Sequence, residues 1–129
     1  MTNIGPRAVV ERYIDEVLNG HGPARAEDLI SNAAFRQRVD SFRAAFPDVA
    51  VVADLIIADG EYVAVHATGR GTHRGIFQGA PPTGRRWSAT TSGLYRVEDG
   101  RIADFWVNWD LLAILEQVGA IQRAGGTSA

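Results

Sequence analysis

The apolar residues of this chain change their spacing once, near Pro47, and that change limits the folds that the chain can adopt. Before Pro47 they recur every three to four residues, as on one face of a helix. After it they alternate with other residues, as in a strand. Helices followed by paired strands are typical of an α+β domain, in which the helices cover one face of an antiparallel sheet. The chain is therefore predicted to fold in this class.

Four helical segments are predicted from apolar residues at helical spacing. They cover about residues 6–18, 23–30, 32–46 and 111–118. The prolines at positions 6 and 23 suit an opening helical turn, whose first amide hydrogens need no partner within the helix. Ser31 or Asn32 is the predicted N-cap of the third helix, which Pro47 ends because proline has no amide hydrogen to donate.

Two β-hairpins are predicted after Pro47, because Asp-Gly between two strand-like segments is a strong signal for a two-residue turn. Their strands and turns are 49–57, Asp59-Gly60 and 61–72 in the first, and 85–97, Asp99-Gly100 and 101–108 in the second. Gly69 and Gly71 interrupt the long second strand where curvature would be tolerated. The sheet is therefore expected to curve and to leave a pocket beneath the helices.

Length and composition exclude several classes of function. The 129 residues are expected to form one domain at 1–122 with a flexible tail at 123–129. The formal net charge is −2, and all thirteen basic residues are Arg, spread along the chain, which argues against a nucleic-acid partner. No window approaches the ~20 apolar residues of a membrane span. Without Cys or a signal segment, the cytoplasm is the expected location.

Four segments of the chain carry a family likeness. Residues 71–75, Gly-Thr-His-Arg-Gly, and residues 79–86, which include Pro-Pro-Thr-Gly-Arg, lie at the spacing of a GTHRG…GxPPTGR pair. Residues 95–102 match a YRVxDGRI hairpin, and residues 111–119 resemble a closing LLxLLxQLG helix. On these segments the chain resembles the SnoaL-like polyketide cyclase family.

The resemblance implies a fold, an assembly and a chemistry. The fold is the cone-shaped one shared with nuclear transport factor 2, in which N-terminal helices pack on a curved antiparallel sheet and a short C-terminal helix follows. The usual assembly is a homodimer. The substrate would be a hydrophobic, polyketide-type small molecule, and no metal or other cofactor is expected. In known family cyclases a pocket Asp moves the protons of an intramolecular aldol condensation.

Two of the family's catalytic positions are occupied here by residues that cannot move a proton. The resemblance aligns the catalytic Asp with Val107, the pocket His with Gly93 and a nearby polar position with Thr91. The segment between the second and third helices is also shorter than in the family. The expected chemistry therefore extends beyond cyclisation to cofactor-free hydroxylation, dehydration or isomerisation.

Asp110 and Asn108 are the candidate catalytic residues. Asp110 follows Trp109 and lies close to Val107, and burial beside an indole would raise the pKa of an Asp toward that of a general base. The alternative is that Asp110 caps the last helix, which lowers a carboxylate pKa and is the better-supported role from its position. Asn108 would orient a carbonyl or a water if a bulge turned it inward. Its alternative role is a strand-end hydrogen bond or a dimer contact.

Six residues are candidates for substrate binding. Strand alternation puts Phe105, Val107 and Trp109 on one face, and the family position at Val107 selects that face as a pocket wall. Thr91 is assigned to the pocket through the family's polar position. The two remaining candidates, on the helices, are Arg38 and Tyr13.

Each of the two helical candidates has a simpler alternative. Arg38 lies one turn from Phe35 and Phe42 and would reach a ligand carboxylate or phenolate at the pocket mouth; otherwise it belongs to a solvated helix face. Tyr13 lies in the apolar stripe of the first helix. It is either a ligand contact or a core residue, and its hydroxyl needs a partner if it is buried.

The three histidines are scattered and lack metal-ligand spacing, so no metal site is expected. His66 shares its strand parity with Tyr62 and Thr68 and is predicted on the convex face of the sheet, in dimer packing. His73 is expected to make a local hydrogen bond, and His21 to be solvated.

Three functions are compatible with these residues. The leading hypothesis is an enzyme that acts on a hydrophobic polyketide-type molecule by cofactor-free acid/base chemistry. The alternative is a non-catalytic dimer that binds such a molecule, and the residues at 107 and 93 favour it. A third is a protein-interaction dimer like nuclear transport factor 2, with a pocket filled by side chains.

Overall fold

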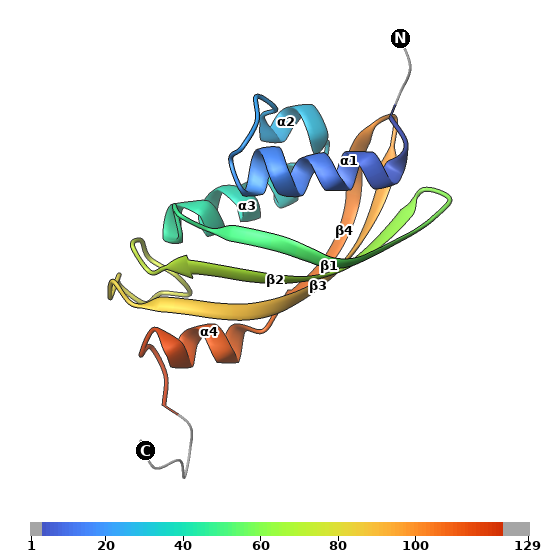
Figure 1. The fold of residues 1–129 in the computed structure, drawn as a ribbon. Helices are drawn as coiled ribbons and strands as arrows, with labels where there is room; N and C mark the ends of the chain where they lie inside the picture. The colour runs from blue at the N-terminus through green and yellow to red at the C-terminus, as the bar shows by residue number, and fades with distance from the viewer. Residues whose placement is uncertain (1–3, 123–129) are drawn as a thin grey trace.

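The computed structural model describes residues 4–122 and consists of helices packed on a curved sheet (Figure 1). The sheet has four antiparallel strands in the order β1-β2-β3-β4. The strands are β1 Ala50–Asp59, β2 Tyr62–Thr72, β3 Arg86–Glu98 and β4 Arg101–Trp109. This arrangement confirms the predicted α+β fold. The predicted tail at 123–129 lies outside the described residues.

Both predicted hairpins are present, and one of their turns differs from the prediction. In the second hairpin, Asp99 and Gly100 form the turn with φ angles of 53° and 75°, as a type I′ turn requires. In the first, the register pairs Asp59 with Tyr62, so Gly60 and Glu61 form the turn. The turn therefore lies one residue later than predicted.

The helices lie on both sides of the sheet: α1, α2 and α3 on one side and α4 on the other (Figure 1). Their bounds are α1 Pro6–Arg12, η1 Tyr13–Leu18, α2 Ala26–Leu29, α3 Ala33–Ala45 and α4 Leu111–Gln117. The short helix α2 begins at Ala26, so the predicted opening at Pro23 is wrong. No helix within residues 4–122 is long and apolar enough to cross a membrane.

The first predicted helix changes its winding at Tyr13. Residues 6–12 are α-helical, whereas Tyr13–Leu18 form a wider π-helical turn, closed by a hydrogen bond from Asn19 N to Ile14 O at 2.9 Å. In this turn four residues are buried together: Tyr13, Ile14, Val17 and Leu18. A π-helical turn is rare and is found frequently at functional sites.

Two asparagine side chains attach the helices to the sheet. Asn19, just after η1, donates to Val51 O at 2.9 Å and accepts from Val51 N at 2.7 Å. Asn32 caps α3 by accepting from Phe35 N at 3.0 Å, and it donates to Ala103 O at 3.0 Å. Each helix end is thereby held against a strand by a side chain that also satisfies backbone groups.

The glycines of β2 make room for two tryptophan rings. A Cβ atom added at Gly69 would lie 2.5 Å from the Trp109 ring, and one added at Gly71 would lie 3.2 Å from the Trp87 ring. Both distances are closer than ordinary carbon contacts. The two glycines therefore allow the indoles to pack directly on the backbone of β2.

Asp48 joins the start of the sheet to the end of β2. Its carboxylate accepts from Thr72 N at 2.8 Å and from the Thr72 hydroxyl at 2.7 Å. The hydrogen bonds from Thr72 lower the pKa of the Asp48 carboxyl. Because the folded-state pKa lies below that of the unfolded chain, the charged carboxylate stabilises the fold above the unfolded pKa.

We predict that Asp48→Ala lowers the free energy of unfolding at pH 7 by about 1–2 kcal/mol, because two hydrogen bonds to a charged group are lost. The difference from the wild type should shrink as the pH falls from about 4 through the lower folded-state pKa. Urea unfolding at several pH values measures this. Asp40→Ala, at an exposed position of α3, is the control and should have a smaller effect. A difference that stays constant down to pH 2 would contradict the role of the charge.

Candidate functional site

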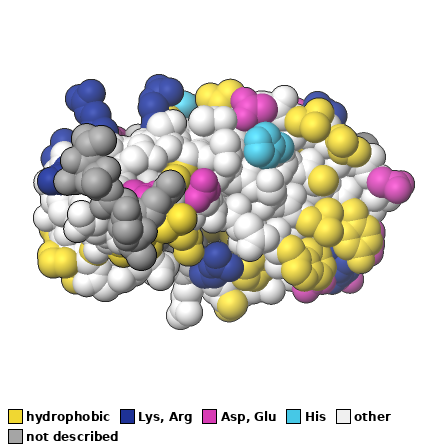
Figure 2. Space-filling model, turned by 90° about the horizontal axis from the view of Figure 1, so that it is seen from below, with side chains coloured by type: hydrophobic (Ala, Val, Ile, Leu, Met, Phe, Trp, Pro, Cys, Tyr) yellow, Lys and Arg dark blue, Asp and Glu magenta, His cyan; other side chains and the backbone are white. Residues whose placement is uncertain are grey.

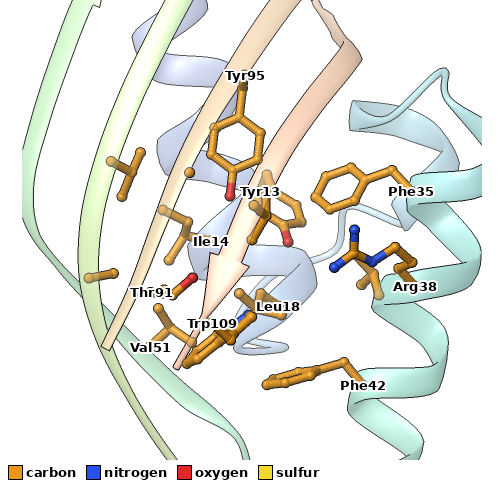
Figure 3. Close-up of a pocket in the computed structure, with 15 residues that line it drawn as sticks. Tyr13, Ile14, Leu18, Phe35, Arg38, Phe42, Val51, Thr91, Tyr95 and Trp109 are labelled. Atoms are coloured by element: carbon orange, nitrogen blue, oxygen red, sulfur yellow. The ribbon is translucent and has the colours of Figure 1, made fainter. Parts of the chain in front are cut away.

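An apolar cavity of about 70 Å³ lies between the helices and the concave face of the sheet (Figure 3). We call it the inner cavity. Its walls come from η1, α3 and all four strands. The residues that line it are Tyr13, Ile14, Leu18, Phe35, Arg38, Val39, Phe42, Val51, Val65, Ala67, Thr91, Gly93, Tyr95, Val107 and Trp109.

A larger outer pocket, of about 580 Å³, adjoins the inner cavity. It is lined by Ala34, Gln37, Arg38, Ser41, Phe42, Ile76, Phe77, Gln78, Val107, Asn108, Trp109 and Leu111. The two spaces share four lining residues, among them Phe42 and Trp109. The rings of Phe42 and Trp109 stack at a centroid distance of 4.8 Å and an interplanar angle of 25°. This stacked pair is a common wall of the two spaces.

The π-helical turn supplies the helical side of the inner cavity. Tyr13, Ile14 and Leu18 all line it, and all are buried. A regular α-helix separates successive residues by about 100°, so it would spread these three side chains over a wider arc. The wider winding of η1 therefore brings a phenol and two aliphatic side chains to one wall.

Two phenols and a guanidinium are the main polar groups of this apolar space. Burial raises the pKa of Tyr13 well above its ordinary value, and burial also raises the pKa of Tyr95. The positive charge of Arg38 lowers the pKa of both phenols, but this effect is smaller than that of burial. Both tyrosines are therefore protonated at neutral pH and are able to donate hydrogen bonds.

Arg38 lines both the inner cavity and the outer pocket. Its guanidinium carbon lies 5.4 Å from the centre of the Phe105 ring, within the range of a cation–π contact. Within residues 4–122 it forms no ion pair. Figure 3 shows its guanidinium turned from α3 toward the cavity. It therefore offers an unpaired positive charge where the two spaces meet.

Two positions that the resemblance aligns with catalytic residues of the family lie in the wall of the inner cavity. Val107 and Gly93 both line it, and the register pairs them as neighbours on β4 and β3. Thr91 lines it too, but its hydroxyl donates to Asn108 O at 3.2 Å. No Asp, Glu or His is among the described residues that line this cavity. The wall thus offers hydroxyl and guanidinium donors instead of a carboxylate or an imidazole.

The predicted strand parity is confirmed for β4. Val107 and Trp109 line the inner cavity, and Phe105 stacks on Phe35 at a centroid distance of 4.4 Å. Trp106, of the opposite parity, is 52% exposed on the other face. Substrate binding by Phe105, Val107 and Trp109 stays a prediction.

The two candidate catalytic residues lie outside the inner cavity. Asp110 is the N-cap of α4, and its Oδ1 accepts from Ala113 N at 3.1 Å, which confirms the capping role. Asn108 lines the outer pocket at the end of β4. Asn108 lines that pocket together with Arg38 and Trp109. Asp110 does not line the inner cavity. Their catalytic roles stay predictions.

The histidines lie where the sequence predicts them. His66 is exposed on the convex face, and its Nδ1 lies 3.1 Å from the hydroxyl of Ser92. His73 is fully buried, with Nδ1 at 3.1 Å from the Thr83 hydroxyl, as expected of a local hydrogen bond. His21 is exposed beside Asp15. Within residues 4–122 no cluster of His, Asp and Glu could hold a metal ion.

Tyr95 is a polar residue of the inner cavity that is not among the candidates from the sequence. It belongs to the family-like segment 95–102, whose pattern predicts only a hairpin. Its parity on β3 is that of Gly93 and Thr91, and both of these were assigned to the pocket. Alternation along the strand was therefore a signal that could have identified Tyr95.

Gly93 makes room for the Tyr95 ring. A Cβ atom added at Gly93 would lie 2.9 Å from the Tyr95 hydroxyl oxygen and 2.9 Å from its ring. The phenol thus lies over the backbone at the position that the resemblance aligns with the family's pocket His. The Tyr95 phenol therefore occupies the space that a side chain at position 93 would need.

We predict that Gly93→Ala lowers the free energy of unfolding by about 1–3 kcal/mol, because the added methyl group overpacks the Tyr95 ring. In a Tyr95→Ala background the same substitution should cost much less. Chemical denaturation of the four proteins of this double-mutant cycle measures the coupling. An equal cost of Gly93→Ala in both backgrounds would show that the two residues do not compete for space.

Known proteins with similar sequences and folds agree with this architecture. The sequence model of the family described as SnoaL-like polyketide cyclase matches residues 2–118. The nogalonic acid methyl ester cyclase of Streptomyces nogalater is 35% identical over 121 residues, 91% of this chain and 88% of that enzyme. IdmH from Streptomyces antibioticus superposes with a TM-score of 0.71 at 26% identity, covering 88% of this chain and 98% of IdmH.

A further solved structure shows the fold alone, because its sequence is more distant. A SnoaL-like polyketide cyclase from Agrobacterium tumefaciens is 21% identical, with a TM-score of 0.73 over 90% of this chain and 99% of that one. The family model spans nearly the whole chain, and the Streptomyces nogalater enzyme covers a similar length. The chain therefore belongs to the SnoaL-like polyketide cyclase family.

Proposed function

We propose that this protein binds a hydrophobic, polyketide-type small molecule between its helices and sheet and acts on it by cofactor-free acid/base chemistry. The observation that carries the proposal is the inner cavity, which is apolar, lined by aromatic rings and shares four lining residues with a larger pocket. Apolar pockets with a few convergent polar groups are the usual sites for small organic ligands. The relationship to a nogalonic acid methyl ester cyclase, within a family of polyketide cyclases, supports this substrate class.

The volumes of the two spaces suggest how such a ligand would lie. An engineered protein cavity of about 150 Å³ holds one benzene ring. The inner cavity, at about 70 Å³, is therefore too small for a polycyclic molecule, whereas the outer pocket has about 580 Å³. The ligand would insert one edge into the inner cavity and keep its remaining rings in the outer pocket. Phe42 and Trp109, which line both, would move apart or stack on its face.

Asp110 is our proposed base for the reaction. Asp110 does not itself line the outer pocket, but its neighbours in sequence, Trp109 and Leu111, do. Only Oδ1 accepts the capping hydrogen bond from Ala113 N, which leaves Oδ2 available to a proton donor. Asn108 would orient a ligand carbonyl or a water in the same pocket. Cyclisation, hydroxylation, dehydration and isomerisation all remain within this class of chemistry.

A non-catalytic binding protein is the second candidate. The hydrocarbon of Val107 and the absent side chain of Gly93 in the cavity wall favour it, because neither can exchange a proton. In this case the protein would hold its ligand unchanged. The location in the cytoplasm and the absence of a cofactor stay predictions for both candidates.

We predict that Asp110→Asn lowers turnover at least about 100-fold without lowering thermal stability, because Asn is a good N-cap but a poor base. The assay incubates the protein with nogalonic acid methyl ester and separates substrate from product by chromatography. Asp110→Ala is the paired variant and should also lower stability, by about 1 kcal/mol. Unchanged turnover in Asp110→Asn would leave Asp110 as a helix cap only. A stoichiometric, unmodified ligand in native mass spectrometry, without turnover, would favour the binding protein.

We also propose that the protein is a homodimer paired through the convex face of the sheet. Exposed apolar side chains gather there (Figure 2), including Leu55 at 56%, Ile57 at 57% and Trp106 at 52% exposure. They surround a shallow hollow of about 390 Å³ that His66 and Leu94 also line. Exposed apolar clusters of this kind commonly mark protein–protein contacts.

We predict that Trp106→Glu converts the dimer into a monomer, because a carboxylate at the centre of an apolar interface would be buried without a partner. Sedimentation equilibrium measures the mass. Ile76→Glu, at a 71% exposed position in the loop before β3, is the control and should leave the mass unchanged. A wild-type protein that sediments as a monomer would contradict the proposed assembly.

A further inference from the structure

The phenol hydroxyls of two buried tyrosines lie at the inner cavity without a hydrogen-bond partner among residues 4–122. Tyr13 is 3% exposed and Tyr95 is 6% exposed, and both line the cavity. Within residues 4–122 neither hydroxyl forms a hydrogen bond, and neither oxygen is among the fully enclosed polar atoms that lack a partner. The two hydroxyls are therefore accessible from the cavity, and an occupant that supplies an acceptor would give them the partner they lack.

The two phenols are held in place by their neighbours. The Tyr13 and Tyr95 ring centres are 5.9 Å apart, and Phe35 lies 5.4 Å from the first and 5.9 Å from the second. Figure 3 shows both hydroxyls turned toward the space between β3 and α3. Gly93 leaves no side chain between Tyr95 and the strand. The donors are thus arranged before a ligand arrives, which lowers the entropic cost of binding it.

The charge around the hydroxyls suits an oxygen that carries negative charge. Burial keeps both phenols protonated, so they are donors and not bases at neutral pH. Arg38 lowers the pKa of each, which means that its positive charge acts on both hydroxyl positions. No described residue that lines the cavity is acidic. A carbonyl or enolate oxygen would meet donors and a positive potential there.

We propose that the Tyr13 and Tyr95 hydroxyls donate hydrogen bonds to one oxygen of the ligand, a ketone or its enolate, with Arg38 as the nearby positive charge. This inference rests on the proposed binding of a hydrophobic small molecule and names the group that orients it. The ligand edge that enters the inner cavity would therefore carry a keto oxygen. The two tyrosines are positioning residues for that oxygen.

The test uses two probes, 1-indanone and indane, which differ only in having a carbonyl or a methylene group at one ring position. Binding of each is measured by isothermal titration calorimetry to the full-length wild type, Tyr13→Phe, Tyr95→Phe and the double variant. Each substitution removes one hydroxyl and keeps the ring, so the cavity wall is preserved. Tyr62→Phe, at a 43% exposed position at the start of β2, is the matched control.

We predict that the wild type binds 1-indanone more tightly than indane, and that each cavity Tyr→Phe substitution lowers this preference about fivefold, the effect of one hydrogen bond. The double variant should bind the two probes about equally. The carbonyl stretching frequency of bound 1-indanone should be lowered in the wild type and in Tyr62→Phe, and should rise toward its value in an apolar solvent in the double variant.

The outcomes separate this inference from the proposed function. Equal binding of both probes by the wild type, or a preference and a carbonyl frequency that survive in the double variant, would overturn the donor pair while leaving an apolar binding site. No binding of either probe would overturn the apolar site and, with it, the donor pair. A ketone preference that falls with each hydroxyl supports both.

Discussion

The close packing of aromatic rings on glycine backbone is the constraint on which this structure depends. Trp109 packs on Gly69, Trp87 on Gly71 and the Tyr95 phenol on Gly93. At each of these glycines a side chain would occupy the space of a ring. The concave face of the sheet is therefore covered by a few large rings that reach across it. Between these rings and the helices the inner cavity of about 70 Å³ remains.

The helical wall of the cavity also depends on how a large side chain is placed. The π-helical turn at Tyr13–Leu18 brings Tyr13 next to Phe35 and Tyr95, and Asn19 holds the end of that turn to Val51 on β1. With the same residues, a regular α-helix would spread Tyr13, Ile14 and Leu18 over a wider arc. Helix winding and sheet composition thus determine together where the two hydroxyls lie.

Much of the fold could be predicted because it depends on local signals. The change of period near Pro47, the Asp-Gly pairs and the family-like segments identify the helices, the hairpins and their order. The parity of β4 also followed, since alternation is a property of any strand. The π-helical turn could not be predicted, because its residues have the same apolar spacing as an α-helix and its winding depends on packing against the sheet. The reason for Gly69 was missed as well: the contact with Trp109 joins residues far apart in the sequence.

A cavity wall without a carboxylate or an imidazole changes what the protein itself must contribute to a reaction. A proton next to a carbonyl becomes more acidic when the oxygen that receives the negative charge meets hydrogen-bond donors and a positive charge. Donors at Tyr13 and Tyr95 would therefore reduce the strength of base that the reaction requires. A weaker base at the rim of the outer pocket would then suffice, where a buried one would pay a desolvation penalty for its charge. If the two phenols stabilise the oxygen in this way, the proposed catalysis does not require a proton-transferring side chain at Gly93 or Val107.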